Sequence, residues 1–162
     1  MRFPSVEELA GWIGLSDAEA VRALHARAYA VKEEFVGRRV SMRGLIEAGN
    51  VCAKDCRYCG IRKSNRNLTR YQLTQEEIVA GARFAAESGY GSVVIQSGEI
   101  ESEAHTRFVE GVLRAIAPLK LGVTLSLGEQ TEDVYRRWRD AGATRYLLRI
   151  ETRRPMTAVF SA

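Results

Sequence analysis

Cysteine and histidine are scarce in this 162-residue sequence, which contains three cysteines and two histidines. An odd number of cysteines argues against a framework of disulfides, and nothing marks the chain as secreted. A structural zinc site needs four nitrogen or sulfur ligands. His25 and His105 lie far from the cysteines in sequence, so such a site would lack its fourth ligand. Three buried free thiols are a further alternative, but a loop rich in glycine and charge is a poor place to bury them.

Long apolar runs and a large excess of charge are also missing. No apolar run approaches the length of a membrane span, and the N-terminal segment MRFPSVEELAGWIG is acidic and amphipathic rather than signal-like. We therefore expect a cytoplasmic protein with no membrane partner. The net charge is only +4. The basic residues after the cysteines, which lack interleaved aromatics or a nucleic-acid motif, predict no nucleic-acid partner. We interpret them as a solvated face or as a rim that attracts an anionic small molecule; they are Arg62, Lys63, Arg66 and Arg70.

The order of the expected elements indicates an α/β fold. Two capping boxes, Ser5 with Glu8 and Ser16 with Glu19, predict a helical preface over residues 1–37. Beyond it, strands alternate with helices. We expect the strands at 40–48, 92–96, 121–127 and 144–150, and the helices at 74–88, 103–117 and 131–142. Parallel pairing follows, because strands joined by single helices need crossover connections.

Residues 38–152 therefore predict a partial TIM-type barrel of about four βα units, followed by a divergent tail at 153–162. A full barrel takes about 250 residues. A partial barrel leaves strand edges and one apolar sheet face open, so we expect the isolated chain to be unstable or dimeric.

All three cysteines, Cys52, Cys56 and Cys59, lie on one short loop with the spacing C-x3-C-x2-C. Clusters of the 4Fe–4S type are normally held by four cysteines. Three thiolates would leave the fourth iron open to a ligand. Active sites of barrels collect at the carboxyl ends of the strands. Glu99, Glu129 and Glu151 follow three successive strands there, and with the cysteines they predict a pocket for a zwitterionic ligand.

The cysteine spacing resembles the signature of the radical S-adenosylmethionine (SAM) superfamily. The likeness extends over RGLIEAGNVCAKDCRYCGIRKSNRNLTRYQLTQEEI, VVIQSGE, VTLSLGE and RYLLRIET. These stretches resemble the FeFe-hydrogenase maturases of the HydE type, which are related to biotin synthase and methylornithine synthase. The resemblance runs to about Thr152 and covers only the N-terminal half of such an enzyme, so we expect a truncated chain.

The resemblance implies a 4Fe–4S cluster on Cys52, Cys56 and Cys59, with SAM as the second cofactor. The implied SAM contacts are Tyr58 near the adenine, Ser97, Gly98 and Glu99 near the methionine amino group, Thr124, and Glu151 at the ribose. Arg149 is expected to orient Glu151 or an anionic substrate. The implied reaction is reductive cleavage of SAM to a 5′-deoxyadenosyl radical.

The biological role implied by the resemblance is maturation of the FeFe-hydrogenase cofactor. The implied partners are a small-molecule substrate, a reductant such as ferredoxin or flavodoxin, and other hydrogenase maturases. Two alternatives remain open. One is another biotin synthase-like radical SAM reaction, such as methylornithine synthesis or sulfur insertion. The other is a cluster-binding fragment without activity.

Overall fold

The computed structural model describes residues 3–149. Contacts within the chain divide it into two compact units, Met1–Val40 and Ser41–Ala162.

The first unit consists of two helices, α1 (Val6–Ile13) and α2 (Ala18–Val36). The predicted capping box of α1 is confirmed: the Glu8 amide donates to Ser5 Oγ, and the Ser5 amide donates to the Glu8 carboxylate. The capping box predicted for α2 is wrong. Asp17 rather than Ser16 is the N-cap, because its Oδ1 accepts hydrogen bonds from both the Glu19 and the Ala20 amides.

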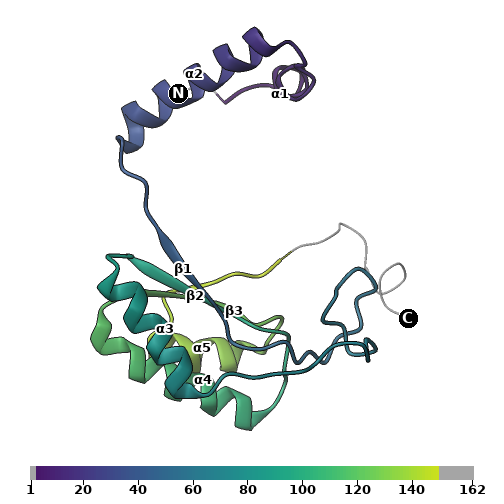
Figure 1. Cartoon of the computed structure of the whole chain (residues 1–162), viewed down its shortest axis with the longest axis vertical. Helices are drawn as coiled ribbons and strands as arrows, with labels where there is room; N and C mark the ends of the chain where they lie inside the picture. The colour runs from purple at the N-terminus through teal and green to yellow at the C-terminus, as the bar shows by residue number, and fades with distance from the viewer. Residues whose placement is uncertain (1–2, 150–162) are drawn as a thin grey trace. The chain divides into compact units, whose positions relative to one another are not determined.

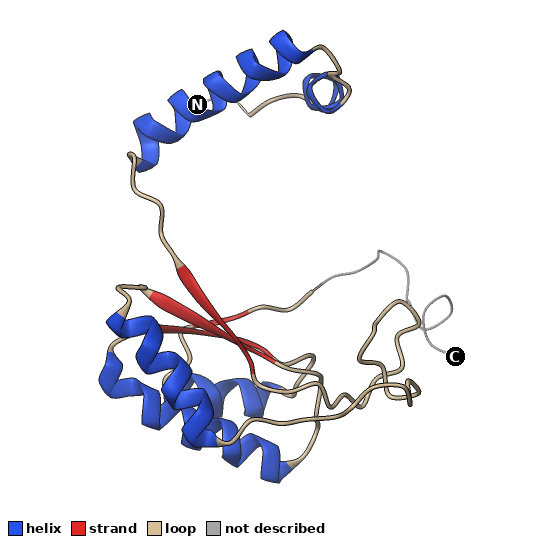
Figure 2. Ribbon diagram, viewed as in Figure 1, coloured by secondary structure: helices blue, strands red, loops and turns tan. Residues whose placement is uncertain are grey.

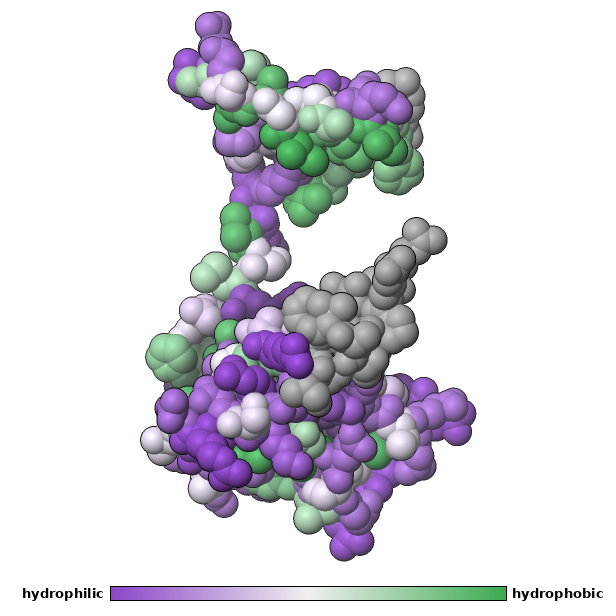
Figure 3. Space-filling model, turned by 90° about the vertical axis from the view of Figure 1, so that its right-hand side faces the viewer, coloured by the Kyte–Doolittle hydropathy of each residue, from purple (hydrophilic) through white to green (hydrophobic). Residues whose placement is uncertain are grey.

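The first unit buries little of its apolar surface. Neither helix contains a buried residue. Its exposed side chains include Phe3, Ile13, Phe35 and Val36, and apolar residues gather on one side of the unit (Figure 3).

The second unit is built on a parallel sheet of four strands in the order β1-β2-β3-β4. The strands are β1 (Arg43–Glu47), β2 (Ser92–Gln96), β3 (Gly122–Ser126) and β4 (Arg145–Tyr146). The connecting helices are α3 (Gln75–Glu87), α4 (Glu103–Ile116), which runs into the 3-10 turn η1 (Ala117–Leu119), and α5 (Glu132–Ala141). Figures 1 and 2 show the helices on one face of the sheet. The predicted partial barrel is confirmed, although β1, β3 and β4 are shorter than expected.

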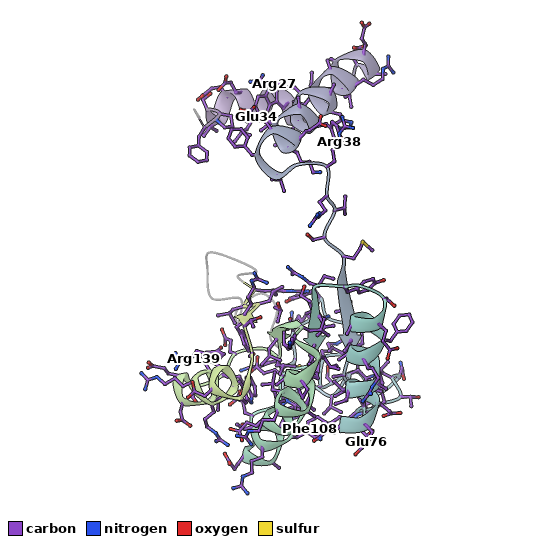
Figure 4. All side chains as sticks on the ribbon, turned by 90° about the vertical axis from the view of Figure 1, so that its left-hand side faces the viewer. Arg27, Glu34, Arg38, Glu76, Phe108 and Arg139 are labelled. Atoms are coloured by element: carbon purple, nitrogen blue, oxygen red, sulfur yellow. The ribbon has the colours of Figure 1, made fainter. Side chains whose placement is uncertain are left out.

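The core lies between the sheet and this helical layer. Figure 4 draws the side chains on the ribbon of both. Alternate strand residues, such as Val93 and Ile95 on β2, point into it and are almost fully buried. Trp138 of α5 is the largest fully buried side chain, and its Nε1 donates to the Thr106 carbonyl at 3.2 Å.

The parallel order places the carboxyl ends of all four strands at the same end of the sheet, where β1 runs into the loop that carries the cysteines. This end is therefore where a site would be assembled. Within the described residues, no helix combines the length and the apolarity that crossing a bilayer requires.

Candidate metal and cofactor site

The cysteine loop, residues 49–72, is closed at its base by backbone contacts. The Ala48 amide donates to the Gln96 carbonyl at 2.7 Å, and the Leu73 amide donates to the Ala48 carbonyl at 2.8 Å. Asn50 is buried and bridges the two ends of the loop. Its Nδ2 donates to the Thr69 carbonyl at 2.9 Å, and its Oδ1 accepts from the Tyr71 amide at 2.8 Å. These hydrogen bonds therefore hold the two ends of the loop together next to β1.

The three cysteines are free thiols, each partly buried. The Cys59 amide donates to the Cys56 carbonyl at 2.9 Å, which makes a tight turn between these two residues. Burial raises the pKa of the Cys56 thiol, and the neighbouring Cys52 and Cys59 raise it further. Cys56 thus lies within electrostatic reach of the other two thiols, and a cationic metal centre would relieve the repulsion between the thiolates.

The donor set consists of three thiols on one loop. Cysteines that bind a cubane each take a different iron, so three of them fit such a cluster with one iron left open. Among residues 3–149, no group of three or more His, Cys, Asp or Glu side chains is placed to hold a metal ion. Tyr58, which was expected near an adenine, lies on the surface of the loop with 53% of its area exposed.

The end of β2 lies directly against the cysteine loop. A Cβ atom on Gly98 would stand 2.2 Å from the Val51 carbonyl oxygen and 2.6 Å from Cys52 Cβ, so only glycine permits this contact. The Ala53 amide donates to the Glu99 carbonyl at 2.8 Å. The hydroxyl of the neighbouring Ser97 donates a hydrogen bond to the Gly98 carbonyl at 2.7 Å.

Glu99 is a buried carboxylate beside this contact. Its Oε2 accepts from the Glu129 amide at 2.8 Å, and Gly128 leaves room for it, because a Cβ atom there would stand 2.3 Å from the same oxygen. Lys54, on the cysteine loop, places its Nζ 2.9 Å from Glu99 Oε1. This ion pair raises the pKa of Lys54. Within the described residues, Glu99 Oε1 thus already faces an ammonium group, that of Lys54.

The other predicted ligand contacts are less closely gathered. Thr124 is buried on β3, on the sheet face opposite the helices, and its Oγ1 has no hydrogen-bond partner among residues 3–149. Arg149 is exposed, and Glu151 lies outside the described residues. Glu129 offers its amide to Glu99, but its own side chain is exposed.

Sequence reasoning missed Lys54 and misinterpreted Arg70. We expected Arg70 to belong to a solvated face or an anion-attracting rim. Instead, its guanidinium donates to four backbone carbonyls within the loop. Nothing local in the sequence separates Arg70 from the neighbouring basic residues, because its acceptors lie 5 to 20 positions away.

Comparison with known proteins identifies the group to which these features belong. The sequence pattern of the radical SAM superfamily matches residues 46–158. The [FeFe] hydrogenase maturase subunit HydE of Thermotoga maritima is 41% identical over 144 residues, which are 89% of this chain and 41% of that protein. The biotin synthase of Macrococcus caseolyticus is 29% identical over 130 residues, which are 77% of this chain and 39% of that enzyme.

Solved structures agree with this assignment. Methylornithine synthase (PylB) superimposes with a TM-score of 0.80 at 25% identity, covering 89% of this chain and 43% of that one. The FeFe-hydrogenase maturase HydG from Carboxydothermus hydrogenoformans gives a TM-score of 0.75 at 25% identity, covering 88% of this chain and 34% of that one. This chain thus spans about two fifths of the length of the curated relatives it matches. It belongs to the radical SAM superfamily.

Proposed function

We propose that this chain forms the cluster- and SAM-binding part of a radical SAM enzyme of the HydE type. Binding of a 4Fe–4S cluster and of SAM is general in the superfamily. The observation that carries the proposal is the contact of Cys52 with Gly98, which sets the buried Glu99 carboxylate beside the cysteine loop. A buried carboxylate and three thiols thus share one end of the sheet.

Each residue has a role that its chemistry supports. Cys52, Cys56 and Cys59 would hold the cluster, which when bound supplies the electron that cleaves SAM to a 5′-deoxyadenosyl radical. Glu99 would bind the SAM ammonium by a charge-assisted hydrogen bond, and Gly98 and Ser97 would shape the backbone next to it. The unpartnered Thr124 hydroxyl would donate to the ligand from the sheet. The resemblance assigns Tyr58 to the adenine, Glu151 to the ribose and Arg149 to the orientation of Glu151.

The identity of 41% to HydE supports hydrogenase maturation as the specific role. In that role the enzyme would work in the cytoplasm on a small-molecule substrate, with a ferredoxin or flavodoxin as reductant and other hydrogenase maturases as partners. The structural likeness to methylornithine synthase favours a second candidate, another reaction of the biotin synthase-like group.

Anaerobic reconstitution tests the shared chemistry. The chain is loaded with iron and sulfide, reduced with dithionite and mixed with SAM. We expect an electron paramagnetic resonance signal that changes on adding SAM, together with release of 5′-deoxyadenosine. Cys56→Ser should lose both. A cluster whose signal ignores SAM would favour a non-catalytic cluster-binding fragment, and zinc binding without iron would overturn the cluster assignment.

The specific role is tested by adding the chain, with the other maturases, to apo-hydrogenase in place of HydE. Recovered hydrogenase activity would support the maturase role. Cleavage of SAM without any such recovery would favour the second candidate.

A further inference from the structure

Arg70 donates four hydrogen bonds within the cysteine loop. Its Nη1 donates to the Asn50 carbonyl at 2.5 Å and to the Ile61 carbonyl at 2.8 Å. Its Nη2 donates to the Arg62 carbonyl at 2.6 Å and to the Asn65 carbonyl at 3.2 Å. Each terminal nitrogen of the guanidinium therefore donates to two carbonyls, and every acceptor is a main-chain oxygen.

These acceptors lie on both sides of the cysteines. Asn50 precedes Cys52 by two positions, and Ile61 follows Cys59 by two. One planar group thus ties the chain before the first thiol to the chain after the last one. The three cysteines are held on a closed ring of backbone.

The same loop carbonyls also stabilise the positive charge of Arg70. None of the ion pairs within residues 3–149 includes Arg70, although its side chain is partly buried. A charged group removed from water needs polar partners, and the four carbonyl dipoles provide them. Arg70 is consequently not available as a free cation on the rim of the site.

We propose that Arg70 is a positioning residue that holds the cysteine loop in its cluster-accepting shape before any metal binds. The inference rests on the proposed function only for the identity of the metal centre. Arginine is specifically required, because a guanidinium presents five donors in a rigid plane, whereas a lysine ammonium has three donors at one point. Lysine would keep the charge and lose the bridge between the two ends of the ring.

Hydrogen exchange on the metal-free 162-residue chain tests the shape directly. The reporters are the amides of Cys59 and Lys63, which donate within the loop to Cys56 and Lys54 at 2.9 and 2.8 Å. Amides of the buried α4 residues Val112 and Leu113 serve as the internal reference for global opening. Arg70→Gln and Arg70→Lys are compared with Arg66→Gln, which removes an exposed arginine of the same loop.

In both Arg70 variants we expect the loop amides to exchange at least about tenfold faster, with the α4 amides unchanged. After reconstitution, both variants should bind less iron, and lysine should not rescue the loss. Arg66→Gln should match the parent chain. If Arg70→Gln also speeds exchange in α4, the comparison is made on Arg70→Lys alone.

Unchanged loop exchange in Arg70→Lys, or full iron binding by it, would overturn the proposal. The failure of the proposed function looks different, since the parent chain itself would then take up no cluster while the exchange result for Arg70 still held.

Discussion

At the scale of single residues, Glu99 has an unusual set of neighbours for a carboxylate at a strand end. It is 7% exposed, one oxygen is bonded to the Glu129 amide, and the other faces Lys54. Lys54 also lies 3.4 Å from the exposed Glu101, which gives its ammonium a second partner. A ligand ammonium can therefore replace Lys54 at Glu99 without leaving Lys54 unpaired.

Glu99→Gln should weaken SAM binding by about tenfold or more, because a hydrogen bond to a charged group is lost. The affinity is measured by equilibrium dialysis on the reconstituted chain. Glu101→Gln is the matched control, since it removes an exposed carboxylate from the same lysine. An equal loss of affinity in both variants would show that only the general negative charge matters.

The two histidines of the chain allow a clean test of pH dependence. His105 is buried in the first turn of α4, where neither ring nitrogen has a hydrogen-bond partner in the described part of the chain, and burial lowers its pKa below 6.5. The unfolded chain then binds the proton more readily, so stability should be full above about pH 6.5 and fall below it, by at most about 1.4 kcal/mol per pH unit.

The measurement is urea denaturation between pH 7.5 and 5. His105→Leu should flatten this part of the pH profile, whereas His25→Leu, which alters an exposed residue of α2, should leave it unchanged. A profile that keeps its slope in His105→Leu would contradict the assignment.

At the scale of elements, the fit between the cysteine loop and β2 depends on the missing side chain at Gly98. Gly98→Ala should displace the loop, because the new methyl group would overlap the Val51 carbonyl and Cys52. We expect iron binding to fall sharply and the unfolding free energy to drop by about 1–3 kcal/mol.

Iron content after reconstitution and urea denaturation measure these two effects. Gly91→Ala is the control, since a Cβ there would meet nothing within 4 Å. Retained iron binding in Gly98→Ala would show that the loop can settle elsewhere.

The elements themselves could be predicted because their signals are local. The capping box of Thr74 with Glu77 and the stop at Gly142 give the beginning of α3 and the end of α5 to within a residue. The predicted start of α2 was wrong, because Ser16 and Asp17 are both good N-caps by residue type. In the structure, Asp17 accepts the hydrogen bonds from the first turn. The cysteines could be predicted from their spacing. Lys54 and Arg70 could not, because their partners are fixed only when the loop closes on the sheet.

At the scale of the whole molecule, the connecting helices cover one face of the sheet (Figure 2). Within the described residues, β1 pairs with no strand except β2, so its outer edge is bonded to no other strand. Leu45 in the middle of β1 points away from the helices and is 60% exposed. Exposed edges with apolar side chains promote pairing between chains.

We therefore expect the chain to self-associate as its concentration rises, and Leu45→Lys to shift it toward the monomer. A lysine on an edge strand disfavours pairing, because a second copy would have to desolvate its charge. Light scattering coupled to size exclusion measures the mass. Phe84→Lys is the control: Phe84 is 67% exposed on α3, in the helical layer, so its charge should not affect pairing at the edge. If Phe84→Lys dissociates the assembly and Leu45→Lys does not, the helical face rather than the edge of the sheet is the contact surface.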